Sequence, residues 1–298
     1  MHPAPSVIFF TTAAGAGYGV LFWLGLLAPL GLLPTAAWFG VTASLLGLAL
    51  VTFGLLSSML HLGHPERAWR AMSQWRTSWL SREGVTSLIT YVPAILFPLL
   101  WLITGAPGPL GVVTAAMSAI TVICTGMIYA SLKPIRQWYN PYVMPIYLLT
   151  AAFSGGACLA AVATIWGADR LLVVVAVIAA VIALVAKLAY WRSIDRGDGA
   201  RTPADATGLG KLGTVRSLDP PNSEENYLLR EMGYRVARKH TARLRIVAVV
   251  LGFIVPILLL PFAAPLAAIL ALLGLLAERW LFFAEATHTI TLYYGRAT

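Results

Sequence analysis

The amino-acid sequence predicts an all-α integral membrane protein, folded as a bundle of eight transmembrane helices. Hydrophobic residues make up 59% of its 298 residues and charged residues only 11%, whereas soluble domains carry about 25% charged residues. The hydrophobic residues form long blocks, and about 20 such residues cross a bilayer as a helix. The alternation typical of a membrane β-barrel is absent, so backbone hydrogen bonds must be made within helices. This composition excludes a soluble enzyme, a nucleic-acid-binding domain and a disulfide scaffold.

Proline, glycine and charged residues separate the hydrophobic blocks and set the bounds of the predicted helices. The first block is not a cleaved signal peptide, because no Lys or Arg precedes it and its apolar run exceeds the roughly 7–15 residues of a signal core. We therefore expect residues 1–298 to form a single membrane domain. Its predicted helices span 6–32, 35–60, 84–104, 109–132, 143–167, 171–191, 244–264 and 266–294.

Charge and loop length differ between the two sides of this predicted bundle. The long loops 61–83, 133–142 and 192–243 fall on the same side as both termini, and nineteen of the twenty-one Lys and Arg residues belong to that side. Short loops rich in Lys and Arg stay in the cytoplasm. The net charge of +9 is therefore a topology signal rather than evidence for nucleic-acid binding, and it predicts that both termini and a basic docking face are cytoplasmic.

The longest loop, 192–243, has two parts. The first part, 192–221, is rich in Gly, Asp, Thr and Pro and is expected to be irregular. Asn222 and Glu225 then form a helix N-cap pattern, so a polar helix is expected over 224–245. The loop is either a solvated connector or a docking loop for partner subunits. We favour docking, because a loop of about 50 residues in a compact protein usually has a function.

The polar segment after the second helix is the first candidate site. Gly63 and Pro65 should end that helix, which places His61 at the membrane boundary on the basic side. An imidazole there can hydrogen-bond a quinone carbonyl and exchange a proton near neutral pH. Arg67 can hold a developing oxyanion, and Glu83 can relay the proton to water. Flat apolar walls would come from Trp69, Trp75 and Trp79. The alternative is an ordinary interfacial belt, in which Trp and Arg anchor helix ends.

The last helix carries the second candidate site. Glu278 and Glu285 are seven residues apart and share a helix face, with Phe282 between them. His288 lies beside this face, and Arg279 follows Glu278 directly. Ionisable groups inside a membrane span are costly, so they predict a proton path or the polar wall of a cofactor site. The alternative is a set of interhelical ion pairs that fix packing. Glu278 and Arg279 point in different directions, so each is expected to pair with another helix.

No pattern indicates a catalytic centre or a metal site within this chain. Walker, Rossmann, zinc and nucleophile-elbow motifs are absent from the sequence. Haem is not expected either. Of the five histidines only His61 and His288 can face the bundle, and neither lies near mid-span with a partner.

Motifs along the whole chain resemble the membrane-anchor subunit family of dimethyl sulfoxide reductase. The segment 61–68, together with Ser81 and Glu83, is fairly specific in its residue types and spacing. The other matching segments are 2–12, 15–19, 236–240, 284–285 and 292–295.

The resemblance implies a bacterial inner-membrane protein of eight helices without haem. It implies docking to a four-cluster iron–sulfur subunit, which binds a molybdopterin catalytic subunit, so that only the partners hold clusters and molybdopterin. Positions that match His61 and Glu83 are associated with menaquinol binding in the family, together with those that match Gly63 and Arg67. Trp69 corresponds to an aromatic position. The resemblance thus implies a quinone, ubiquinone or menaquinone, as the cofactor.

Three functions compete at this point. The first is a quinone-reactive anchor that exchanges electrons between the quinone pool and the iron–sulfur subunit. The second is a secondary transporter, whose midplane site would use broken helices at Pro93, Pro98, Pro256 or Pro261. The third is a purely structural anchor that touches no quinone. Among relatives of the family, an assembly on the cytoplasmic face resembles the membrane-bound sulfite dehydrogenase. Sulfite oxidation is therefore the first expectation, and sulfoxide reduction with menaquinol is the second.

Overall fold

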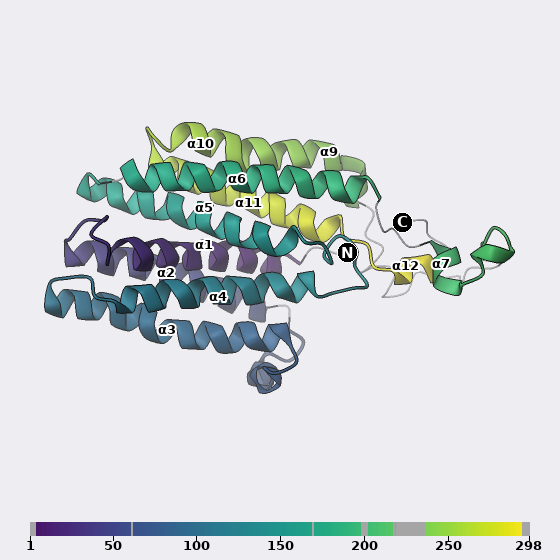
Figure 1. Cartoon of the computed structure of the whole chain (residues 1–298), viewed down its shortest axis with the longest axis horizontal. Coiled ribbons are helices and arrows are strands. Elements are labelled where there is room, and N and C mark those ends of the chain that lie inside the picture. The colour runs from purple at the N-terminus through teal and green to yellow at the C-terminus, as the bar shows by residue number, and fades with distance from the viewer. Residues whose placement is uncertain are drawn as a thin grey trace.

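Every regular element is helical in the part of the chain that the structure describes (Figure 1). This computed structural model describes residues 4–60, 62–168, 170–197, 202–216, 218 and 236–293. Within these ranges eight helices are long and apolar enough to cross a membrane, which confirms the predicted fold class. Seven of them run without a break: α1 (Pro5–Leu27), α2 (Ala37–Met59), α3 (Trp79–Thr104), α4 (Leu110–Ala130), α5 (Val143–Ala163, extended by η2, Thr164–Trp166), α6 (Arg170–Asp195) and α11 (Ala264–Ala284).

The remaining span joins α9 (Val236–Val249), the π-helical turn η4 (Val250–Ile254) and α10 (Val255–Leu259). Pro256 has no amide hydrogen to donate to Gly252, so a regular α-helical bond is missing at this turn. By contrast, α3 continues through Pro93 and Pro98. Of the two proline-containing spans that the sequence singles out, only the later one departs from α-helical geometry.

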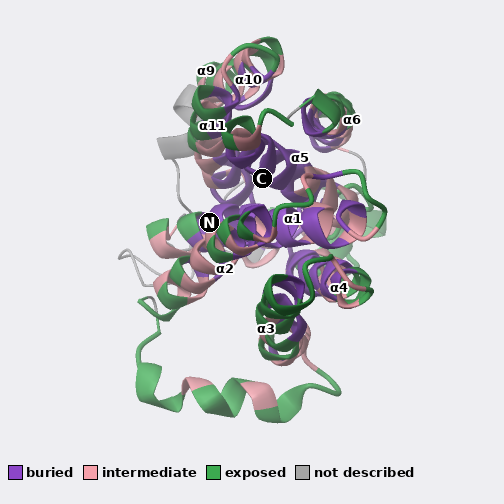
Figure 2. Cartoon of the chain, turned by 90° about the vertical axis from the view of Figure 1, so that its left-hand side faces the viewer, coloured by how far each residue is buried: buried purple, intermediate pink, exposed green. Residues whose placement is uncertain are grey.

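Helix α1 forms the centre of the bundle (Figure 2). It packs against α2, α4, α5 and α11, and most of its residues are buried. On one side α3 packs on α4; on the other, α6 packs on α5 and α9 packs on α11. Side chains between these helices are therefore enclosed by protein, whereas the outer helices leave large apolar side chains exposed, as lipid contact requires.

The backbones of α1 and α5 touch at Gly19 and Gly155. A Cβ atom on Gly19 would lie 1.9 Å from the carbonyl oxygen of Ala151, and one on Gly155 would lie 2.1 Å from the carbonyl carbon of Gly19. In a membrane, where lipid is as apolar as the helix surface, such small residues allow the close packing that holds helices together. This contact holds α5 against the central helix.

Two helices differ from their predicted bounds for local reasons. α1 ends at Leu27 rather than at 32, because the chain turns through Gly31, whose φ is +71°. α3 begins at Trp79 rather than at 84, with the Ser78 hydroxyl accepting a hydrogen bond from the amide of Ser81 as an N-cap.

Two further helices differ because of tertiary contacts. α11 ends at Ala284 rather than at 294, because the backbone beyond it pairs with the loop between α4 and α5. There the Thr289 amide donates to the Pro134 carbonyl at 3.0 Å. α6 runs to Asp195 instead of ending at 191, and Asp195 accepts two hydrogen bonds from Arg245 of α9.

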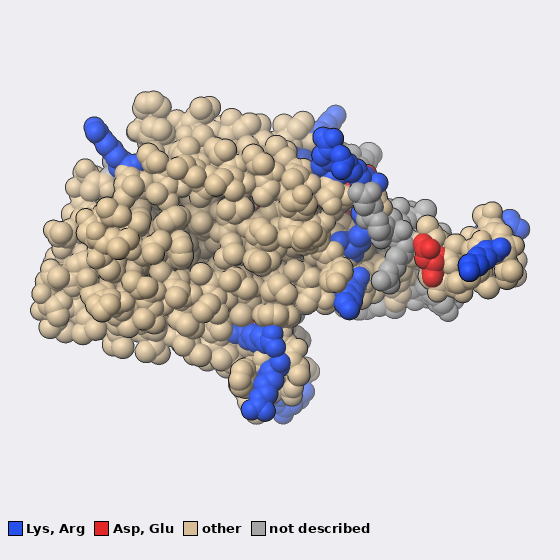
Figure 3. Space-filling model, in the orientation of Figure 1, with Lys and Arg blue, Asp and Glu red and all other residues tan. Residues whose placement is uncertain are grey.

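Basic side chains gather at one end of the molecule (Figure 3). That end holds the start of α1 and the end of α11, with η1 (Pro65–Gln74), α7 (Pro203–Thr207), η3 (Gly210–Leu212) and α12 (Ile290–Tyr293). The sequence-based count for this side is one too high, because Lys187 is buried within the bundle at 1% exposure. Asn222 and Glu225 lie outside the described residues.

Gly155→Ala is expected to destabilise the bundle by about 1–3 kcal/mol, because the added methyl group overlaps the α1 backbone. Thermal unfolding of the purified protein in detergent measures this. Gly108→Ala is the matched control, since a Cβ atom there meets nothing within 4 Å. Equal melting temperatures for the two variants would contradict the proposed close contact.

Candidate functional site

The segment that follows α2 lies across the basic end of the bundle, at the bottom of Figure 2. His61 is outside the described residues. Gly63 is exposed, and a Cβ atom on it would meet nothing within 4 Å. Arg67 and Trp69 lie on η1, of which no residue is buried. Trp69 is 66% exposed, and Arg67 Nε lies 3.7 Å from Glu66 Oε1. These predicted quinone residues therefore face outward at the basic end.

Tryptophan–arginine contacts fix the start of α3. The Arg82 guanidinium lies 4.2 Å from the ring centroid of Trp79 and donates to the carbonyls of Trp75 and Arg76 at 3.0 and 2.7 Å. The Ser81 hydroxyl donates to a carbonyl of η1. These contacts account for Trp75 and Trp79 as anchors of the helix end, as the interfacial-belt alternative predicts.

Glu83 occupies a different environment from Arg67 and Trp69, although it lies only one turn inside α3. Its side chain is buried at 5% exposure, and its Oε1 accepts a hydrogen bond from the hydroxyl of Thr125 on α4. The carboxylate thus points into the bundle. The structure places Glu83 inside the bundle, whereas Gly63, Arg67 and Trp69 of the described predicted residues lie outside it.

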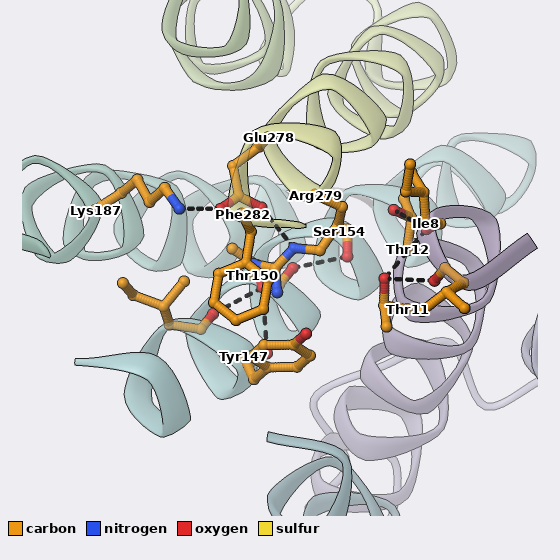
Figure 4. A network of polar contacts seen from close by, with 12 residues as sticks. Ile8, Thr11, Thr12, Tyr147, Thr150, Ser154, Lys187, Glu278, Arg279 and Phe282 are labelled. Atoms are coloured by element: carbon orange, nitrogen blue, oxygen red, sulfur yellow. Dashed lines mark hydrogen bonds and ion pairs between the residues drawn. The ribbon is translucent and has the colours of Figure 1, made fainter. Parts of the chain in front are cut away.

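Glu278 of the second candidate site accepts from two cations in the bundle interior (Figure 4). Its Oε1 pairs with Nζ of Lys187 on α6, and its Oε2 accepts from Nε of Arg279 at 2.5 Å. The three side chains are 0–3% exposed. The expectation that Glu278 pairs with another helix is confirmed by Lys187. The expectation that Arg279 points elsewhere is wrong in part, because its Nε turns back to Glu278.

Aromatic rings surround these charges. Arg279 lies 4.2 Å from the ring centroid of Tyr147 on α5, and Lys187 lies 4.5 Å from that of Tyr190. Such contacts stabilise a cation that has lost its water. The terminal nitrogens of Arg279 and the Tyr147 hydroxyl nevertheless make no hydrogen bond of ordinary geometry among the described residues. They border a cavity of about 20 Å³.

Glu285 and His288 follow the last turn of α11. Glu285 interacts electrostatically with Lys187 but pairs with a different cation. Glu285 accepts from Arg245 Nε at 2.7 Å, and Arg245 also binds Asp195. Burial raises the pKa of Glu285, although Arg245 opposes the shift. Partial burial lowers the pKa of His288, whose Nδ1 accepts from the Ile290 amide at 3.1 Å. The structure therefore brings together two of the four residues predicted for a proton path.

Sequence reasoning missed four residues of these networks: Thr125, Tyr147, Lys187 and Arg245. Lys187 carried a usable signal, because it lies inside the predicted span 171–191. An ionisable residue at that depth should have been assigned a partner. Thr125 and Tyr147 carried none, since their roles depend on which helices become neighbours.

Comparison with known proteins decides the family. Residues 1–295 match the family described as DMSO reductase anchor subunit (DmsC). The chain belongs to this family. It is also 34% identical to a sulfite dehydrogenase subunit of Allochromatium vinosum over 324 residues, which cover 99% of each chain.

This membership confirms the resemblance drawn from the motifs. The chain is a multi-pass membrane anchor of a molybdoenzyme complex. Anchors of this kind serve catalytic and iron–sulfur partner subunits. The transporter alternative is set aside.

Glu278→Gln is expected to cost about 3–5 kcal/mol or to prevent assembly, because it leaves two buried cations side by side without their anion. Lys187→Met should cost far less, since Glu278 and Arg279 remain as a neutral pair. Thermal unfolding of the purified variants gives the comparison. Equal losses would contradict a single carboxylate that neutralises both cations.

Proposed function

We propose that this anchor exchanges electrons between the membrane quinone pool and an iron–sulfur partner subunit, with its quinone site at the basic ends of α2 and α3. The observation that carries the proposal is Glu83, a buried carboxylate one turn inside the basic end, at a position that the family associates with menaquinol binding. Electrons must arrive from a docked subunit. A site at the opposite end would be a bilayer thickness away from it.

The surroundings suit a quinone that enters from lipid. Leu60 at the end of α2, Leu80 in the first turn of α3 and Trp69 on η1 are 82%, 55% and 66% exposed. They give apolar surface on the elements that carry the proposed site. Flat rings favour aromatic surfaces, and quinone carbonyls need hydrogen-bond donors.

Each proposed site residue has a role that fits its placement. His61 and Glu83 exchange protons with the quinone oxygens, and Arg67 stabilises negative charge on them. Trp69 supplies a flat wall, and the absence of a side chain on Gly63 leaves room beside it. A bound quinone supplies the two-electron redox chemistry. Glu278 and Arg279 act behind Glu83, as argued below.

The basic end is proposed as the docking face. There α7 and η3 project beyond the bundle (Figure 1), and η1 packs against α3. A four-cluster iron–sulfur subunit would dock here and carry a molybdopterin catalytic subunit. Lys and Arg of short loops keep this face in the cytoplasm. The match to the sulfite dehydrogenase subunit supports sulfite as the substrate of the complex. Sulfoxide reduction with menaquinol is the second candidate, favoured by the family description.

His61→Ala and Glu83→Gln should each lower quinone-linked turnover of the purified complex by about 100-fold or more, the size of a lost proton-transfer group. Activity with a soluble dye that bypasses the anchor should stay intact. His64→Ala is the matched control, because the exposed imidazole of His64 bonds Glu66 and no other side chain among the described residues. Normal quinone-linked turnover in both site variants would leave a purely structural anchor.

The orientation is tested by reporters fused after Thr298. A fluorescent protein should be bright there and alkaline phosphatase inactive, since the phosphatase needs an oxidising compartment. Active phosphatase with a dark fluorescent protein would place the docking face outside. That outcome would favour sulfoxide reduction.

A further inference from the structure

Four acidic or basic side chains of the described residues are buried, and together they carry no net charge. They are Glu83 of α3, Lys187 of α6, and Glu278 and Arg279 of α11. A charge removed from water needs a compensating charge nearby. Lys187, Glu278 and Arg279, hereafter the triad, carry two positive charges and one negative. The triad therefore has a surplus positive charge. Glu285 also interacts electrostatically with Lys187, but its carboxylate is paired with Arg245. Among the four buried residues, Glu83 is the one that can balance the surplus.

The surplus charge is directed toward the middle of the bundle. Lys187 is held by Glu278 and by the rings of Tyr190 and Trp191, at 4.5 and 5.0 Å from their centroids. Arg279 donates to Glu278 through Nε alone. Its two terminal nitrogens have no hydrogen bond of ordinary geometry among the described residues. Arg279 lines the cavity together with Tyr147, whose hydroxyl interacts with this guanidinium without meeting ordinary hydrogen-bond geometry.

The cavity connects Arg279 with the partner of Glu83. Its volume of about 20 Å³ is enough for one water molecule. Its polar lining comes from Thr11, Thr12, Tyr18, Thr125, Tyr147, Thr150, Ser154 and Arg279, and several of these surround the guanidinium in Figure 4. Thr125 is the donor to Glu83. A water in this cavity would join unbonded donors on one side to the hydroxyl that binds Glu83 on the other.

No other charge in the described interior competes for Glu83. The ionisable groups that interact with it electrostatically are Tyr18, Cys124, Tyr129 and Tyr147, from α1, α4 and α5. Tyrosine and cysteine are neutral near pH 7. The neighbouring Arg82 turns to the surface, where it donates to two carbonyls before α3. The triad is thus the buried counter-charge available to Glu83.

We propose that the cavity holds a water molecule, through which the triad stabilises Glu83 as a carboxylate after Glu83 has given its proton to the quinone. This rests on the proposed function. A quinone takes two electrons from the iron–sulfur subunit and two protons to become a quinol; Glu83 supplies one proton and recovers it from solvent at the basic face. Arg279 is a positioning residue, which acts on the reaction without touching the quinone.

The test uses the purified complex and compares Arg279→Gln, Arg279→Lys and, as a control at the opposite end, Arg170→Gln. Infrared spectroscopy over a pH series, without added quinone, follows the carboxyl band of Glu83, assigned by its loss in Glu83→Gln. We expect Arg279→Gln to raise the pH at which Glu83 loses its proton and to lower quinone-linked turnover about 10-fold or more. Arg279→Lys should restore the native midpoint, and Arg170→Gln should match the native protein.

Thr125→Val keeps the side-chain volume and all buried charges, so it tests the link even where Arg279→Gln does not assemble. It should also raise the pH at which Glu83 loses its proton. An unchanged titration midpoint of Glu83 in Arg279→Gln, or in Thr125→Val where the former is not obtained, would overturn the coupling even if turnover fell. Full quinone-linked turnover in Glu83→Gln would instead overturn the proposed function, while the band measurement would still report on the coupling.

Discussion

The carboxylate of Glu278 is the interaction on which the interior of this bundle depends. Moving an ion out of water costs several kcal/mol even after relaxation, and this site holds three ions at 0–3% exposure. One anion between two cations offsets that cost at short range and ties α6 to α11. α6 otherwise packs mainly on α5, so the ion pair joins elements that apolar packing brings together only weakly.

The rest of the core is arranged so that these charges can exist. Small residues in α1 and α5 allow a backbone contact at the centre. Aromatic rings, with Tyr129 and Phe282 in the middle, then cover the cations from the basic end. Rings tolerate an adjacent cation and exclude lipid and bulk water at once. The polar interior is therefore enclosed rather than open to the basic face.

The sequence predicts the fold well because membrane crossing depends on the length and hydrophobicity of consecutive blocks of residues. Eight blocks of sufficient length had to become eight helices, and the π-helical turn follows from Pro256. Helix ends that local chemistry sets, such as the turn at Gly31, differ by a few residues. The end of α11 differs more, because pairing of Thr289 with Pro134 is a tertiary event that no local pattern encodes.

The candidate sites were predictable only in part, for a related reason. Glu83, Glu278 and Arg279 stand out as charges within apolar blocks. The free-energy cost of placing a charge in a membrane span is enough to mark them as functional candidates. Lys187 has the same property, but the sequence-based charge count includes it in the basic face because it lies near a run of basic residues. The hydroxyl of Thr125 and the ring of Tyr147 gain their roles from helix neighbours, and a single sequence contains no record of those.

The division of the site at the first turn of α3 has a chemical consequence. In the proposed function, electrons reach the quinone from outside the bundle, so groups that hold the quinone and face the partner belong on exposed elements such as η1. A proton donor gains from the opposite placement, because a carboxylate behind Thr125 is held away from bulk water and responds to buried charges at low dielectric. A short segment between α2 and α3 can serve both needs if the helix start separates them. Exposed Arg67 and Trp69 beside buried Glu83 are the arrangement that this separation requires.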